Sequence, residues 1–257
     1  MNDESRQHVI NSLRENIRID GRTREAYREI SIETGFTKNA EGSAKVKIGD
    51  TEVMAGVKLS VESPYGDTPD QGNLMVNVEL LPLSNPEFES GPPSIDAIEL
   101  ARVVDRGIRE SKAIDVKKLC IKPGEKVWMV SIDICSINDD GNLFDASALA
   151  AVAAIRDAKF PEFDGKTLDY KKLTKNKLPL TKVPVTVTVW KIGDNLIIDP
   201  LKEEEKASSA RITVASTEDG NLCAMQKGGD AALSMEELKK MIELGLSKAS
   251  ELRKVMG

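Results

Sequence analysis

Apolar residues recur at helical spacing in the middle of the chain, between positions 94 and 112. Pro92 and Pro93 precede this stretch, and Ser94 can accept a hydrogen bond from a free N–H group of a first helical turn. At about 100° per residue, five apolar positions fall on one side: Ala97, Leu100, Ala101, Val104 and Ile108. The pattern predicts an amphipathic helix that packs against a core.

The opposite side of this predicted helix carries Arg102, Arg106 and Arg109, within about 60° of one another. Such a row favours binding of phosphates or other anions. However, Asp105 lies four residues before Arg109, and Arg106 lies four residues before Glu110, so two ion pairs could neutralise the row on an ordinary solvated surface. The pattern alone leaves both interpretations open.

Three other stretches have helical periodicity: residues 3–18, 143–159 and 234–256. The first places Val9, Leu13 and Ile17 on one side, and the second is an alanine-rich run that can pack closely on a sheet. The third begins with Ser234 and Glu237, the arrangement of a capping box. We predict a helix at each of the three.

Strand-like segments form two groups. The first group comprises residues 27–34, 44–48, 52–61, 73–81, 118–121 and 126–137. The second comprises residues 183–192, 196–199, 210–215 and 222–227. Because strands followed by helices occur twice, the pattern predicts an α+β architecture with two similar halves packed together. Residues 1–160 form the first half with its N-terminal helix, residues 161–182 a lysine-rich crossover, and residues 183–257 the second half.

Composition indicates a globular protein of one large or two modest domains, with 257 residues of which 40% are hydrophobic. The formal net charge of −6 argues against a protein that coats nucleic acid non-specifically, so a nucleic-acid site would be a local patch. The charged N-terminus and the lack of 18 consecutive apolar residues predict a soluble, cytoplasmic protein without a secretory signal or membrane contact.

The small number of histidines and cysteines excludes several kinds of catalytic and metal site. His8 is the single histidine, which excludes a Ser-His-Asp triad and a multi-histidine metal site. Cys120, Cys135 and Cys223 are far apart in sequence, and we expect buried, reduced thiols. No Walker loop or dinucleotide-binding fingerprint is present.

Two acidic stretches resemble metal sites only superficially. Residues 136–147 have the length of a calcium loop, but Ser147 stands where a bidentate glutamate is needed. Asp199 and residues 203–205 could in principle hold Mg²⁺, yet an acidic run flanked by lysines is more typical of a solvated turn. We therefore expect no metal site and no cofactor.

Five motifs occur in a defined order along the chain. They are RIDGR at residues 18–22, the hairpin at 42–53, the arginine-bearing helix at 99–109, Asp-Pro followed by three glutamates at 199–205, and MQKGG at 225–229. In this order they resemble the RNase PH family. More narrowly, GPPSIDAIELARVVDRGIRES and DDGNLFDASALAA look like the non-catalytic RNase PH-like ring subunits of the archaeal exosome.

The resemblance implies a fold of two related βαβ-type units and a place in a six-membered ring, alternating with a catalytic RNase PH-like paralogue. It further implies phosphate-dependent 3′-to-5′ degradation of single-stranded RNA by that ring, with S1/KH-type RNA-binding cap proteins as further partners. The RNA-contacting positions of the family match best at Arg102 and Arg106, and helix geometry adds Arg109.

Two departures from active family members oppose catalysis by this chain. Active members are expected to carry a glycine-rich loop with an arginine before their second helix, but residues 140–144 here contain Leu143 and Phe144 and no arginine. Arg211 stands where their general-acid aspartate is expected, and an arginine stays charged near neutral pH. The resemblance therefore predicts no catalytic residues in this chain. Two alternatives remain: a phosphorolytic exoribonuclease active on its own, and a ring scaffold without RNA contact.

Overall fold

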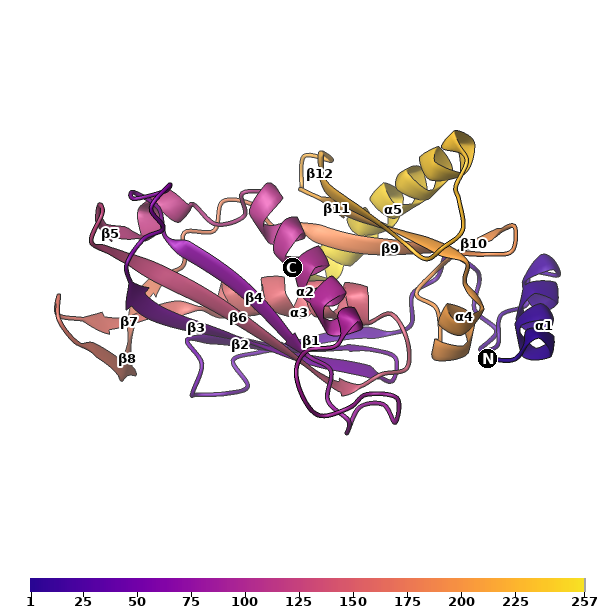
Figure 1. Cartoon of the computed structure of the whole chain (residues 1–257), viewed down its shortest axis with the longest axis horizontal. Coiled ribbons are helices and arrows are strands. Elements are labelled where there is room, and N and C mark those ends of the chain that lie inside the picture. Colours follow the sequence, from indigo (N-terminus) through magenta and orange to yellow (C-terminus); the bar gives the residue numbers. More distant parts are fainter. Residues whose placement is uncertain (257) are drawn as a thin grey trace.

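Two large β-sheets lie side by side in the computed structural model, which describes residues 1–256 (Figure 1). The first sheet has the strand order β1-β2-β3-β6-β4, with β5 paired to β6. Its strands are β1 (Ile30–Thr34), β2 (Gly42–Ile48), β3 (Thr51–Glu62), β4 (Asn73–Glu79), β5 (Cys120–Lys122) and β6 (Lys126–Asn138). β4 runs parallel to β6, and the other pairs of this sheet are antiparallel.

The helix α3 (Leu143–Asp157) lies at the centre of the molecule and contacts β2 and β3 of the first sheet as well as β9 of the second. All of its residues from Leu143 to Ile155 are buried except Phe144, which is half-buried. The many alanines allow this close packing because a short side chain lets the backbone approach a sheet. α2 (Ile95–Glu110) packs on α3 and β4, and a short 3₁₀ helix (Val116–Leu119) follows it.

The second sheet has the order β10-β9-β11-β12 and is antiparallel throughout. Its strands are β9 (Val185–Ile192), β10 (Asn195–Ile198), β11 (Ala210–Ser216) and β12 (Leu222–Gly228). α5 (Met235–Met256) packs on β9 and β11. The approach of α5 requires Gly245, because a Cβ there would lie 2.5 Å from Cγ2 of Val214. The predicted α+β architecture is confirmed.

α1 (Asp3–Arg14) and α4 (Lys202–Ala207) pack together beside the second sheet, at the right of Figure 1. A small apolar cluster holds them there: Val9, Leu13, Trp190, Ile192, Ile197 and Ala207. The prediction that the first helix extends to residue 18 with Ile17 on its inner side is wrong. The helix ends at Arg14, the chain turns at Asn16 with φ 60°, and Ile17 is 55% exposed.

Residues 161–182 connect the two halves, but most of the segment forms a β-hairpin that the sequence pattern does not predict. β7 (Lys159–Phe163) pairs with β8 (Leu168–Lys177) with two register shifts. The hairpin is anchored by Trp128 of β6, whose ring centroid lies 5.0 Å from that of Phe160 and 5.8 Å from that of Phe163. Lysines and register shifts hide the alternation that would identify β8 from sequence.

Two further expectations need correction. The acidic run at residues 203–205 is part of helix α4 and not a solvated turn, because Glu204 is fully buried and pairs with Arg18 at 2.5 Å. The three cysteines are free but only half-buried. No helix within residues 1–256 is long and apolar enough to span a membrane.

Candidate functional site

The predicted arginine helix forms α2, and its first turn is capped as expected. The Oγ of Ser94 accepts a hydrogen bond from the N–H of Ala97 over 3.2 Å. The buried side of the helix includes Leu100, Val104 and Ile108, whereas Ala101 is half-buried. This packing fixes the rotation of the helix and leaves its arginine side facing outward.

The three arginines of α2 differ in their contacts. Arg109 forms an ion pair with Asp105 over 2.6 Å and donates a hydrogen bond to the carbonyl of Leu74 over 3.0 Å. The hydrogen bond from Arg109 to Asp105 raises the pKa of this arginine above its usual value. Arg102 and Arg106 are exposed and make no ion pair or hydrogen bond within the described chain. Of the two ion pairs considered from sequence, only that of Arg109 forms, so the guanidinium groups of Arg102 and Arg106 are unpaired within the described chain.

Arg211 lies close to the N-terminal part of the same helix. Its Nη2 is 2.7 Å from Oε1 of Glu99 in α2, and its guanidinium carbon lies 4.3 Å from the ring centroid of Phe144 and 5.5 Å from that of Trp190. Gly228 makes room for it, because a Cβ there would clash with Nη1 of Arg211. The residue expected at the general-acid position is therefore a buried cation stacked against aromatic rings and paired to a carboxylate.

A cavity of about 380 Å³ lies beside Arg211, between α2, α3 and α4. The three cations that line it are each paired: Lys202 with Asp139 at 2.6 Å, Lys206 with Glu87 at 2.5 Å, and Arg211 with Glu99 at 2.7 Å. Asp96 and Glu205 add negative charge to the lining. Inorganic phosphate would find no unpaired cation in this cavity and would be repelled by its carboxylates.

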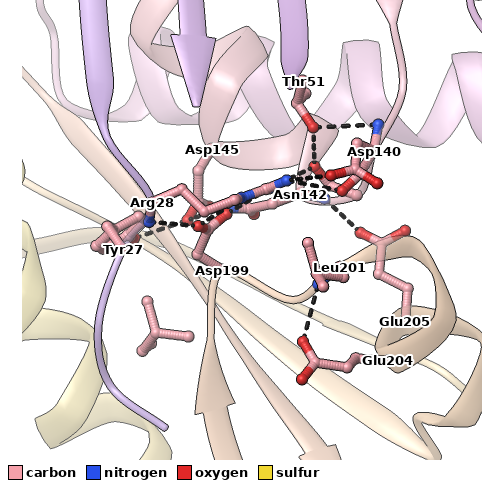
Figure 2. Close-up of polar contacts among 12 residues, drawn as sticks. Tyr27, Arg28, Thr51, Asp140, Asn142, Asp145, Asp199, Leu201, Glu204 and Glu205 are labelled. Atoms are coloured by element: carbon pink, nitrogen blue, oxygen red, sulfur yellow. Dashed lines mark hydrogen bonds and ion pairs between the residues drawn. The ribbon is translucent and has the colours of Figure 1, made fainter. Parts of the chain in front are cut away.

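The loop before α3 is also occupied by protein groups (Figure 2). The backbone N–H of Asn142, at the start of α3, donates to Oε1 of Glu205 over 2.7 Å. Helix N-termini bind anions, and here a carboxylate of the chain itself takes that position. Burial raises the pKa of Glu205, against the opposing effect of Lys202. The Oγ1 of Thr51 donates to the carbonyl of Gly141 over 2.6 Å, which fixes the loop from the other side.

Comparison with known proteins identifies the family. Domain 1 of the 3′ exoribonuclease family matches residues 26–161, and domain 2 matches residues 182–248. The chain belongs to the RNase PH family of 3′ exoribonucleases. The β7–β8 hairpin falls mostly between the two matched regions.

Several relatives of this RNase PH chain are exosome components. The exosome complex component Rrp42 of Thermococcus gammatolerans is 47% identical over 254 residues, which cover 98% of this chain and 93% of that protein. The exosome complex component Rrp42 of Thermoplasma acidophilum is 47% identical over 96% of this chain and 93% of its own length.

Solved structures of exosome chains have a fold similar to that of this chain. A chain of the Archaeoglobus fulgidus exosome with RNA bound to the active site superposes with a TM-score of 0.92 and 44% identity over 99% of this chain and 98% of that one. A chain of an archaeal exosome core gives a TM-score of 0.87 and 42% identity over 99% of this chain and 96% of that one. Rice Rrp46, at 20% identity and a TM-score of 0.70, shares the fold.

Two of the RNase PH motifs, at residues 18–22 and 199–205, meet in a buried polar network around Asp199 (Figure 2). Asp199 is fully buried, and its carboxylate accepts hydrogen bonds from Nη2 of Arg28 at 2.7 Å, Nη1 of Arg22 at 2.8 Å and Nδ2 of Asn142 at 2.9 Å. Arg28 also donates to Asp140. The network ties the N-terminal segment and the loop before α3 to the second half of the chain.

The charged residues Arg22, Arg28 and Asp199 lie outside the arginine row of α2. Their charges are explained by their pairing with one another inside the fold. Burial opposes the charged form of Arg28 and is the largest single effect on its pKa, but the hydrogen bond to Asp199 and the nearby negative charges of Asp199, Asp140 and Glu205 together raise the pKa above its usual value. Asp199 and Glu204 therefore serve as partners of arginines, and no cluster able to hold a metal ion occurs within residues 1–256. Hydrophobic periodicity cannot predict such a network, because charged residues in a sequence are normally expected at the protein surface. The fixed order of motifs is the only sequence signal.

Asp145 extends the same network into α3. Its Oδ2 accepts hydrogen bonds from the hydroxyl of Tyr27 at 2.8 Å and from Nδ2 of Asn142 at 3.2 Å. Burial raises the pKa of Asp145 to about 7, and these hydrogen bonds oppose the shift. Burial and the nearby Asp145 carboxylate raise the pKa of Tyr27 as well. Asp145 is therefore the member of this network whose pKa lies near neutrality.

Proposed function

We propose that this chain is a non-catalytic subunit of an archaeal exosome ring that binds RNA through α2, while a catalytic RNase PH-like paralogue carries out phosphate-dependent 3′-to-5′ degradation. The observation that carries the proposal is that Arg102 and Arg106 are exposed, unpaired within the described chain and on one side of the same helix. Guanidinium groups in this arrangement suit successive phosphates of one strand. Arg109, which is tied to Asp105, extends the row toward the end of the helix.

The relatives, which are exosome components, support assembly of this chain with other exosome subunits and RNA. The chain alternates with the catalytic paralogue in a hetero-hexameric ring, and S1/KH-type cap proteins deliver single-stranded RNA to it. With few aromatic side chains to stack on bases, this chain holds RNA by its phosphates and does not read sequence.

Three features support the absence of catalysis. The cations beside the cavity are all paired, Glu205 occupies the start of α3, and Arg211 stands where an acid is needed. The cavity beside Arg211 thus offers no unpaired cation to phosphate, and the position expected to hold the general acid is occupied by an arginine. Both duties fall to the paralogue.

Reconstitution with the paralogue tests this proposal. We expect the purified chain alone to release no nucleoside diphosphates from RNA and phosphate, and the mixed ring to release them. Release by the chain alone would favour the second candidate, an independent exoribonuclease.

Charge reversal of the arginine row separates an RNA-binding subunit from a scaffold. We expect R102E/R106E to assemble into the ring but to weaken RNA binding and trimming. R14E/K254E is the matched control, because it changes the net charge by the same amount at two exposed positions of α1 and α5. Equal effects of the two double variants would favour a scaffold without specific RNA contact.

A further inference from the structure

Glu99 is the natural intrahelical partner of Arg102. The two residues are three positions apart on α2, and a carboxylate one turn before an arginine is a favourable arrangement for an ion pair. Glu99 also lies two turns before Arg106, so its carboxylate shares the side of the helix that carries the arginine row. On an isolated helix, Glu99 would neutralise part of the charge that RNA phosphates require.

This pair does not form in the folded chain. Oε1 of Glu99 is instead 2.7 Å from Nη2 of Arg211, which reaches α2 from strand β11. Arg102 makes no ion pair within the described residues. The carboxylate that would compete for Arg102 is therefore bound by Arg211, a residue far along the chain in the second half.

Arg211 cannot easily release Glu99. Its side chain is only 10% exposed, lies against the rings of Phe144 and Trp190, and fits against a glycine at position 228. Its Nε is buried and makes no hydrogen bond, so Glu99 is the one carboxylate paired with this guanidinium in the described chain.

We infer that Arg211 is a positioning residue for RNA binding: it holds Glu99 away from Arg102 and thereby leaves the Arg102 guanidinium free for a phosphate. The inference rests on the proposed function of α2 and adds a role for the position where active relatives are expected to carry an acid. Under this inference, Arg211 both replaces the expected general acid and keeps Arg102 available to bind RNA.

The first test is Arg211→Met in the ring reconstituted with the catalytic paralogue. Methionine is unbranched and can fill the space between the two rings without a charge. Glu99 is then free to pair with Arg102, and we expect the affinity for single-stranded RNA to fall about two- to fivefold, the range of exposed ion pairs. The slope of log affinity against log salt concentration should also decrease, by up to about 0.7 for one lost phosphate contact.

The decisive comparison is the double variant E99Q/R211M. It lacks both partners, so no carboxylate remains to neutralise Arg102, and we expect RNA affinity and salt slope to return to the wild-type values. A purely structural role of Arg211 predicts the opposite, because the double variant would then bind RNA as weakly as R211M or more weakly. Ring mass and thermal unfolding of each variant show whether assembly is intact.

R102Q separates failure of this inference from failure of the proposed function. If R102Q leaves RNA affinity unchanged, the proposed role of α2 is wrong. If R102Q weakens binding but R211M does not, the role of Arg211 alone is wrong. Should R211M not assemble, Glu99→Gln decides: an affinity close to wild type supports the inference, whereas a gain of about fivefold or more would show that Glu99 already competes for Arg102.

Discussion

The backbone N–H of Asn142 donates a hydrogen bond to Oε1 of Glu205 over 2.7 Å, at the N-terminus of the central helix α3. A helix N-terminus next to a loop is a common place for phosphate to bind, because free N–H groups and the helix dipole favour an anion. In this chain the anion is supplied by α4. The same contact therefore stabilises α3 and places a protein carboxyl group where an external anion could otherwise bind.

Replacing Glu205 by alanine should destabilise the chain by about 1–3 kcal/mol, because it leaves a buried N–H group without an acceptor. Glu203→Ala is the matched control, since Glu203 is exposed in the same helix and should change stability by less than about 0.5 kcal/mol. Urea unfolding of the two variants measures the difference. Equal stabilities would show that Glu205 does not hold the start of α3.

The network around Asp199 should be among the most sensitive parts of the fold. Arg28→Met leaves the Asp199 carboxylate buried with fewer partners, and the expected loss of stability is about 3–5 kcal/mol. The double variant R28M/D199N should recover part of that loss, because no uncompensated charge then remains. Thermal unfolding of wild type, both single variants and the double variant gives the coupling between the two residues. Additive losses would contradict the account of this network.

Stability should depend on pH through Asp145. Its pKa in the folded chain is about 7, above the ordinary value of an aspartate, so the folded state binds more protons than the unfolded state between about pH 4 and pH 7. Stability from this group is complete below the unfolded pKa and is lost as pH rises toward 7, by at most about 1.4 kcal/mol per pH unit. Asp145→Asn, which keeps an oxygen to accept from Tyr27, should lose this dependence.

The measurement is urea unfolding of wild type and D145N at several pH values between about 5 and 7.5, within the window where the two states differ in proton binding. The stability of D145N relative to wild type should increase as pH rises. A difference that stays constant with pH would mean that Asp145 is not protonated in the folded chain.

Gly228 should not tolerate a side chain. An added Cβ would clash with Nη1 of Arg211 and displace a guanidinium that is packed on two rings. Gly228→Ala should cost about 1–3 kcal/mol, as other overpacked substitutions do. Gly66→Ala serves as control, because no atom lies within 4 Å of the position that its Cβ would take and its φ is not positive. Thermal unfolding distinguishes the two, and equal melting temperatures would mean that Arg211 moves aside without cost.

Hydrophobic periodicity is sufficient to predict the main architecture. It predicts α2, α3, α5 and most strands because their buried residues follow periods of about 3.6 or 2. It misses β7 and β8 because register shifts and lysines break the alternation. It misses α4 because the run of charged residues in this helix is typical of a surface turn. Glu204 is nevertheless buried, since it pairs with Arg18.

The position of the candidate site can be predicted from sequence, but the pairing of its residues cannot. Helical spacing places Arg102, Arg106 and Arg109 on one side of α2, and it does not decide which of them find partners. Asp105 pairs with Arg109, whereas Glu99, which lies one turn before Arg102, pairs with Arg211. That outcome depends on a contact between residues far apart in sequence, which spacing within one helix cannot reveal.

The salt dependence of RNA binding tests the central claim most directly. In the ring reconstituted with the catalytic paralogue, R102Q/R106Q removes two guanidinium groups and keeps polar side chains at both positions. If both arginines hold phosphates, affinity for single-stranded RNA should fall, and the slope of log affinity against log salt concentration should decrease by about 1.4, which is about 0.7 for each lost contact. An unchanged slope together with unchanged affinity would contradict the claim that α2 binds RNA.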